Sequence, residues 1–252
     1  SGTFLFENLS LETGIDITDR DAIETYFSRS NAPWVWHFAA VTSVDTSESE
    51  RALGEKSNTW KVNVQATEHI VNACKRLHKR LLYLSTDFVF DGTKERYSEE
   101  DTPNPQGWYA MTKYEGEKLV ASLGSNGLIV RIANPYKAVQ TGKPDFVETI
   151  YQRLKNGQQV KAPTDQLFVP TYVDDIAYAL EKLIKRNSHG IYHVVGSQAL
   201  SPYDACRKIA TSSGLPSSLV TPTVFTDYFQ NRAPRPFHGV LTNAKITKLG
   251  LS

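Results

Sequence analysis

The sequence predicts an α/β fold in which a parallel sheet is covered by helices on both faces. Apolar runs rich in aromatic and β-branched residues, typical of buried strands, span residues 34–41, 80–86, 127–132 and 190–195. Amphipathic helical patterns span residues 58–78, 108–123, 146–155, 172–185 and 202–212. Strand and helix alternate along the first three strands, and such an order requires crossover connections and therefore parallel pairing. Short elements punctuated by Gly and Pro follow Pro135, and the stretch from Leu215 is expected to be irregular.

Composition excludes several classes of protein. The 252 residues include 28 Lys+Arg and 27 Asp+Glu, a balance that argues against a nucleic-acid-binding protein. No apolar run approaches the roughly 18 residues of a membrane-spanning helix. The two cysteines, Cys74 and Cys206, lack partners at zinc-binding spacing, so neither a disulfide scaffold nor a metal site is expected. A reducing, cytoplasmic compartment fits this usage.

The start of the chain lacks one feature of doubly wound, Rossmann-like sheets. Such sheets open with a strand, a Gly-rich turn and a helix whose N-terminus binds a pyrophosphate, yet no Gly-x-Gly-x-x-Gly occurs among the 15 glycines. We therefore expect a first strand and its Gly-rich loop to precede Ser1, with Ser1–Phe4 ending the second strand. The alternative is a chain that never had this segment and does not bind a dinucleotide tightly.

Three Tyr-x-x-x-Lys patterns are candidates for proton transfer: Tyr109/Lys113, Tyr114/Lys118 and Tyr178/Lys182. Residues four apart share a helix face, and a lysine there can lower the pKa of the phenol toward neutrality. Tyr109 begins its helix after a Pro/Gly loop, near the sheet edge where ligands bind in open α/β folds. Thr86 ends the strand before that helix and supplies a hydroxyl at the same edge. Tyr114 is expected to point away, and Tyr178 to pack as a core or boundary residue.

Other polar residues have structural interpretations. His37 lies within an apolar run and is expected to be a buried, hydrogen-bonded histidine. Asp87 and Asp91 are possible turn formers, Asp16 a loop residue, and Thr18 or Asp19 a helix cap. Serine hydrolase chemistry lacks its Gly-x-Ser-x-Gly motif, and metal catalysis lacks a ligand cluster.

Several segments together resemble the extended short-chain dehydrogenase/reductases. They are Asp16–Asp19, His37–Asp45 with Asn63, Leu84–Gly92, and Tyr109–Glu117, followed by Asp165-Gln166, Pro170-Thr171, Asp174–Ala177 and Arg235-Pro236. The chain is most similar to the dTDP-4-dehydrorhamnose reductase group, which also includes the regulatory subunit of methionine adenosyltransferase. The resemblance implies NAD(P)H-dependent reduction of a nucleotide-linked 4-keto sugar. The alternatives are a nucleotide-sugar epimerase and a non-catalytic, NADP-binding regulatory subunit, whereas Phe88 after Thr86-Asp87 disfavours a dehydratase.

The resemblance also implies roles for individual residues. Tyr109 would donate the proton to the ketone oxygen, Thr86 would hydrogen-bond that oxygen, and Lys113 would hold the nicotinamide ribose and lower the pKa of Tyr109. The remaining cofactor contacts would be Asp16 and Ile17 beside the adenine, and Ala39, Ala40 and Val41 close to the cofactor. The substrate contacts would be Asp87, Asn134, Gln166 and Arg235.

Domain boundaries follow from the same resemblance. The dinucleotide-binding domain is expected to take residues 1–136, rejoined by 172–197, and the smaller substrate domain residues 137–171 and 198–252, with homodimerisation by analogy. Asn134-Pro135 stands where related reductases often carry an aromatic residue. The identity of the sugar substrate is therefore left open. Gly2–Phe4 shows no acidic residue that would hold a ribose 2′-hydroxyl, and this favours NADPH over NADH.

Overall fold

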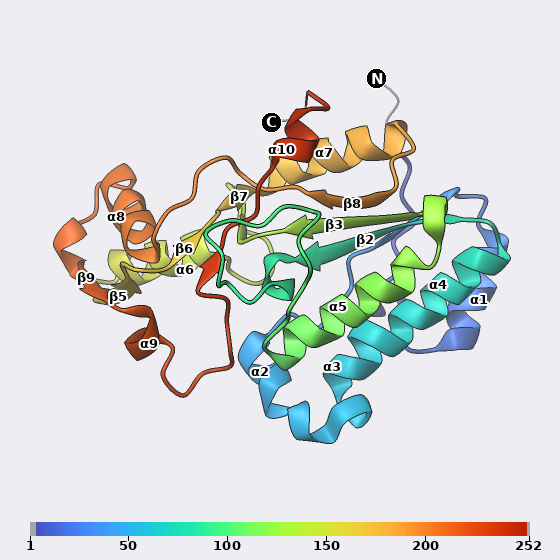
Figure 1. Cartoon of the computed structure of the whole chain (residues 1–252), viewed down its shortest axis with the longest axis horizontal. Coiled ribbons are helices and arrows are strands. Elements are labelled where there is room, and N and C mark those ends of the chain that lie inside the picture. The colour runs from blue at the N-terminus through green and yellow to red at the C-terminus, as the bar shows by residue number, and fades with distance from the viewer. Residues whose placement is uncertain (1–3, 251–252) are drawn as a thin grey trace.

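The computed structural model describes residues 4–250 and contains a parallel sheet of four strands in the order β1-β2-β3-β8 (Figure 1). The strands are β1 (Trp34–His37), β2 (Arg80–Thr86), β3 (Gly127–Ile132) and β8 (Gly190–His193). The predicted α/β class is confirmed, and β2 and β3 have their predicted bounds. The predicted strands 34–41 and 190–195 were too long, because the backbone leaves the sheet after His37 and after His193.

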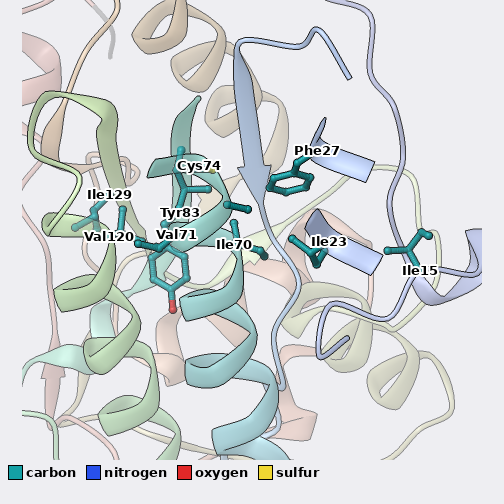
Figure 2. Close-up of a cluster of buried hydrophobic side chains, with 11 residues drawn as sticks. Ile15, Ile23, Phe27, Ile70, Val71, Cys74, Tyr83, Val120 and Ile129 are labelled. Atoms are coloured by element: carbon teal, nitrogen blue, oxygen red, sulfur yellow. The ribbon is translucent and has the colours of Figure 1, made fainter. Parts of the chain in front are cut away.

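One face of the sheet is covered by α1 (Arg20–Arg29), α4 (Ala66–Arg76) and α5 (Trp108–Ala121). Figure 2 shows their shared core, in which Tyr83 of β2 lies between side chains from the helices. Asp19 caps α1 by accepting hydrogen bonds from the backbone N–H groups of Asp21 and Ala22, as one of the two predicted caps. Ile23 and Phe27 of α1 complete this core, which fixes the three helices relative to the sheet.

The predicted helix 58–78 is not a single α-helix. It consists of α3 (Asn58–Trp60), the π-helical turn η3 (Lys61–Gln65) and α4. π-Helical turns often mark functional positions because they displace a residue from the regular helical face. The displaced stretch here contains Asn63, whose buried amide takes part in the site described below.

The opposite face is covered by α7 (Val173–Lys185) and the short α10 (Ala244–Thr247), as Figure 1 shows. Ile176, Leu180 and Leu183 of α7 pack on the sheet together with Ile246 of α10. Residues near the C-terminus therefore return to the sheet core. Tyr178 was expected at the core or its boundary, but 52% of its surface is exposed, because it lies on the opposite side of α7 from the packed residues.

A second, smaller lobe contains α6 (Phe146–Lys155), α8 (Pro202–Ser212) and the strand pair β5 (Val160–Pro163) and β9 (Val220–Thr223). It has its own apolar cluster, which includes Ile150, Leu154 and Cys206. Ser201 caps α8, because its side chain accepts a hydrogen bond from Asp204 N–H. The bounds of α6 and α8 are those predicted from the sequence.

The remaining elements are short. They are η1 (Leu11–Thr13), α2 (Val44–Ser49), η2 (Arg51–Lys56), η4 (Asp87–Val89), η5 (Gly124–Asn126), β4 (Pro135–Tyr136), β6 (Leu167–Phe168), β7 (Thr171–Tyr172), η6 (Ser217–Leu219), α9 (Phe225–Tyr228) and β10 (His238–Gly239). The stretch after Leu215 therefore contains short elements, where the sequence suggested irregular structure, since its strands pair with β5 and β6. Ser1–Thr3, expected to end a strand, lie outside the described residues. Within residues 4–250, none of the helices has the length and apolar character needed to cross a membrane.

Candidate active site

Two hydroxyl groups meet at the C-terminal end of β2. Thr86 is the last residue of that strand, and its Oγ1 accepts a hydrogen bond from Phe88 N–H at 3.2 Å. Tyr109 lies in the first turn of α5, and its ring packs edge-on against that of Phe88 with 5.9 Å between centroids. The Thr86 side chain lies near enough to Tyr109 to lower the pKa of its phenol. The structure thus brings together the two groups that the sequence placed at this edge.

The pKa of Tyr109 differs from expectation. Burial of the phenol raises its pKa to about 12, and the effect of Thr86 only partly offsets that rise. Lys113 does not lower it, so the expected depression of the pKa by this lysine is wrong for the structure described here. The reason is the direction of the lysine side chain, which lies on Tyr83 instead.

Lys113 is a buried cation. Its Nζ lies 4.0 Å from the centroid of the Tyr83 ring, a cation–π contact. Only 4% of the residue is exposed, and this burial lowers the pKa of the ammonium to about 7, although the charge of Glu117 acts to raise it. A lysine with such a pKa can carry or release a proton near neutral pH.

Asn63 joins the loop after β1 to α5. Its Oδ1 accepts a hydrogen bond from Val41 N–H at 2.8 Å, and its Nδ2 donates to Val41 O at 3.1 Å and to Thr112 Oγ1 at 3.0 Å. Because Thr112 precedes Lys113, the amide sets the distance between the Ala39–Val41 loop and the helix of the tyrosine and lysine. The sequence motif included Asn63, but its role depends on the π-helical turn and was not predicted.

His37 is the satisfied buried histidine that the sequence predicted. Its Nε2 lies 2.9 Å from Thr67 Oγ1, whose own proton is donated to Asn63 O, so Nε2 is the donor. Burial, together with the charge of Lys113, lowers the pKa of His37 to about 3. The imidazole is therefore neutral at physiological pH.

The first turn of α5 is held in place by residues from other elements. Glu48 of α2 accepts a hydrogen bond from Trp108 N–H at 2.7 Å through Oε2, and thereby satisfies a free N-terminal donor next to Tyr109. The Trp108 ring stacks on that of Trp60 with 5.7 Å between centroids. Nothing in the local sequence identified Glu48, because its partner is 60 residues away.

The segment Pro234–Gly239 lies against the part of the site that contains Asp87. A side chain at Gly92, where φ is +79°, would overlap the backbone of Phe237, so this position requires glycine. A side chain at Gly239 would come within 2.8 Å of Asp87 Oδ2, so Gly239 lies directly against that carboxyl. Gln166, near β6, donates a hydrogen bond to Pro236 O at 3.2 Å. The predicted substrate residues Asp87, Gln166 and Arg235 are therefore connected by one segment.

Arg235 is fixed by two further contacts. Its Nη2 lies 2.8 Å from Asp45 Oδ2, and its guanidinium lies over the Phe229 ring. It borders a cavity of about 530 Å³ whose lining also includes Gln106, Phe225 and Arg232. Gln106 is three residues before Tyr109, so this cavity adjoins the loop leading into the tyrosine.

Other predicted residues lie apart from this cluster or make local contacts. Asp16 Oδ1 accepts hydrogen bonds from Thr18 N–H and Oγ1–H in an exposed turn. Asp91 forms the predicted turn by accepting from Thr93. Asn134 has a positive φ of 41° and its backbone oxygen accepts from Thr171 N–H. A second cavity, of about 670 Å³, lies between α7 and α8 and is not lined by Thr86, Tyr109 or Lys113.

Asp87 makes a pH-dependent contribution to stability. Burial raises the pKa of its carboxyl to about 7, while the Thr86 hydroxyl donates to Oδ1 at 3.0 Å. Between the unfolded and folded pKa values the folded chain retains a proton that the unfolded chain releases, so stability falls as pH rises through that window. We expect Asp87→Asn to exceed the wild type in unfolding free energy by about 2–4 kcal/mol near pH 8 and to match it near pH 4, as measured by urea denaturation.

The matched control for this prediction is Asp227→Asn, which removes one exposed carboxylate from α9. It should show no comparable dependence on pH. An equal stability difference for Asp87→Asn at both pH values would contradict the assignment of a buried, protonated carboxyl.

The sheet and the paired hydroxyls with a buried lysine are those of an extended short-chain dehydrogenase/reductase. Comparison with known proteins narrows this class. The chain belongs to the RmlD substrate binding domain family, whose model matches residues 7–252. It is 33% identical over 244 residues to dTDP-4-dehydrorhamnose reductase of Mycobacterium tuberculosis, covering 94% of this chain and 77% of that one.

Two further comparisons extend this finding. Methionine adenosyltransferase 2 subunit beta of Xenopus tropicalis is 28% identical, with 94% of this chain and 71% of the relative covered. The crystal structure of dTDP-4-dehydrorhamnose reductase from Bacillus anthracis in complex with NADP superposes with a TM-score of 0.85 at 28% identity, covering 94% of this chain and 81% of that one.

Proposed function

We propose that this chain is an NAD(P)H-dependent reductase of a nucleotide-linked 4-keto sugar, of the dTDP-4-dehydrorhamnose reductase type. One observation carries the proposal: Thr86 at the end of β2 neighbours Tyr109 in the first turn of α5, and the buried Lys113 follows Tyr109 by one helical turn. The similarity to dTDP-4-dehydrorhamnose reductases over 94% of the chain supports the same reaction class.

The reaction follows from what these three side chains can do. A bound nicotinamide supplies the hydride that reduces the ketone carbon. When the ketone is bound, the Thr86 hydroxyl turns its proton from Asp87 Oδ1 to the carbonyl oxygen, and Tyr109 donates to the same oxygen. Both bonds strengthen as negative charge develops there. Tyr109 then transfers its proton to this oxygen, since its high pKa keeps the phenol protonated until the oxygen becomes more basic. The tyrosinate that remains is a strong base, because burial raises the pKa of Tyr109, and it takes up a proton again before the next turnover.

The residues around Lys113 fit the nicotinamide half of the cofactor. The ammonium is buried on Tyr83 and suits a ribose hydroxyl, while the small side chains of Ala39 and Ala40 allow close approach to the loop held by Asn63. We assign Val41 to the same loop contact, and Asp16 with Ile17 to the adenine end. The NADP in the Bacillus anthracis relative supports NADPH as the preferred reductant.

The nucleotide-sugar side is assigned to the segment and cavity next to Tyr109. Arg232 and Arg235 border the cavity of about 530 Å³ together with Phe225, a combination suited to phosphates and a planar base. Asp87 and Asn134 are assigned to the sugar and Gln166 to the nucleotide side. We retain residues 1–136 with 172–197 as the nucleotide domain and 137–171 with 198–252 as the substrate domain, although Ile246 packs with the sheet.

The proposal is tested with dTDP-4-dehydrorhamnose, NADPH and the purified chain, by following the loss of NADPH absorbance and identifying the product by mass spectrometry. We expect turnover with a gain of two hydrogens in the sugar. Tight NADPH binding without turnover of this or any other 4-keto sugar nucleotide would contradict the proposal.

A second function is favoured by one observation, the match to methionine adenosyltransferase 2 subunit beta over 94% of the chain. In that case the chain would bind NADP and regulate a partner synthetase without catalysis. Co-purification with an adenosyltransferase, with no reductase activity, would support this alternative.

We also propose a cytoplasmic location and a homodimer. The two buried free cysteines suit a reducing compartment. Size-exclusion chromatography with light scattering distinguishes dimer from monomer.

A further inference from the structure

A second buried ion pair lies behind Lys113. Arg131 of β3 and Glu117 of α5 form a two-point contact, with Nε–Oε1 at 2.8 Å and Nη2–Oε2 at 2.7 Å. Their side chains are 1% and 3% exposed. A pair of this geometry, withdrawn from water, holds the carboxylate in one position.

Arg131 is fixed on its other sides as well. It lies level with His193 in the neighbouring strand β8, and its Nη1 is 3.4 Å from His193 Nε2. Its guanidinium lies 5.0 Å from the centroid of the Phe90 ring. Burial, and next the charge of Arg131, lower the pKa of His193 to about 3, so the imidazole carries no charge. The guanidinium therefore relies on Glu117 for compensation.

Glu117 is one helical turn after Lys113 on the same buried face of α5. The groups facing the ammonium from the other elements are the neutral ring of Tyr83 on β2 and the neutral imidazole of His37 on β1. Within the described part of the chain, Glu117 is the charged group that raises the pKa of Lys113. The Glu117 carboxylate thus pairs with the buried guanidinium of Arg131 and also raises the pKa of the buried Lys113 ammonium.

We propose that Glu117 is a positioning residue for Lys113: held by Arg131, its carboxylate supplies the fixed negative charge that favours the ammonium form of Lys113, one helical turn from Tyr109 on α5. Glu117 touches neither ketone nor cofactor in this assignment and acts through the lysine. The catalytic meaning rests on the proposed function, but the electrostatic link between the two residues does not.

The link is measured directly by titrating the protein labelled with ¹³C at lysine Cε. NMR follows each lysine with pH, and the signal of Lys113 is the one lost in Lys113→Arg. In Glu117→Gln, which keeps the side-chain length, we expect the titration midpoint of Lys113 to fall by about one pH unit, because the ammonium loses its nearest negative charge. An unchanged midpoint would overturn the proposal.

Two further variants keep the test decisive. Should Glu117→Gln fail to fold because Arg131 is left unpaired, the double variant Glu117→Leu with Arg131→Met removes both charges. A smaller fall in the same direction is then expected, because the opposing charge of Arg131 is lost as well. An unchanged midpoint in the double variant also overturns the proposal. Glu181→Gln is the control, since it breaks an exposed Glu–Lys pair of α7 and should leave Lys113 unaffected. The NMR titration of Lys113 does not depend on enzyme activity. An inactive wild-type protein would therefore contradict the proposed function but not the link between Glu117 and Lys113.

Discussion

Tyr109→Phe lowers turnover of the keto-sugar nucleotide by about 10²- to 10⁴-fold, the usual contribution of a general acid. The ring remains packed against Phe88, so the fold and cofactor affinity are retained while the transferable proton is lost. Because the pKa of Tyr109 is high, the phenol is protonated throughout the neutral pH range. Ionisation of Tyr109 therefore does not change the turnover rate with pH in that range. Steady-state rates, together with NADPH affinity from fluorescence titration, measure the effect.

The control for this variant is present in the same chain. Tyr178 and Lys182 repeat the Tyr-x-x-x-Lys pattern on α7, where the Lys182 ammonium lies 5.0 Å from the Tyr178 ring centroid. Tyr178→Phe should retain full activity because that tyrosine lies away from β2. Wild-type turnover by Tyr109→Phe, or an equal loss in both variants, would contradict the assignment of Tyr109 as proton donor.

Arg131→Met reduces the free energy of unfolding by about 3–5 kcal/mol, because it leaves the Glu117 carboxylate buried without a partner. The double variant with Glu117→Leu should recover most of that loss, since two apolar side chains of similar volume replace a pair whose desolvation costs offset its attraction. Urea denaturation of the four proteins in the cycle gives the coupling energy between the two residues.

Arg76→Met is the matched control for this cycle. Arg76 pairs with Glu24 at 2.9 Å, but its side chain is 52% exposed, so its removal should cost less than about 1 kcal/mol. If Arg131→Met and Arg76→Met were equally stable, the Arg131–Glu117 pair would have to be hydrated, contrary to its burial.

Local sequence patterns predicted much of the fold. β2, β3, α6 and α8 begin and end as expected, because apolar periodicity, Pro at the first helical position and the Ser201 cap act over a few residues. The helix over 58–78 was not predicted correctly. Its π-helical turn is stabilised by bonds from the Asn63 side chain to Val41, which is distant along the sequence.

In the site, too, the features set by local sequence were predicted, and those set by contacts between distant residues were not. Strand-end position and helical spacing were enough to place Thr86 near Tyr109, which the structure confirms. The direction of the Tyr109 pKa shift could not be predicted, because it depends on how deeply the phenol is buried. The ion pair between Glu117 and Arg131 also could not be predicted from the sequence, because only the packing of β3 against α5 brings the two residues together.

Pro234–Gly239, which lies against Asp87 and Gly92, comes from a part of the chain far from the sheet strands in sequence. The sheet strands β1, β2, β3 and β8 are complete by His193, well before this segment leaves the ribosome. In the folded chain Gly239 lies against Asp87, and the backbone of Phe237 lies against Gly92. A nascent chain therefore presents all four sheet strands before the segment that lies against Asp87 has been synthesised.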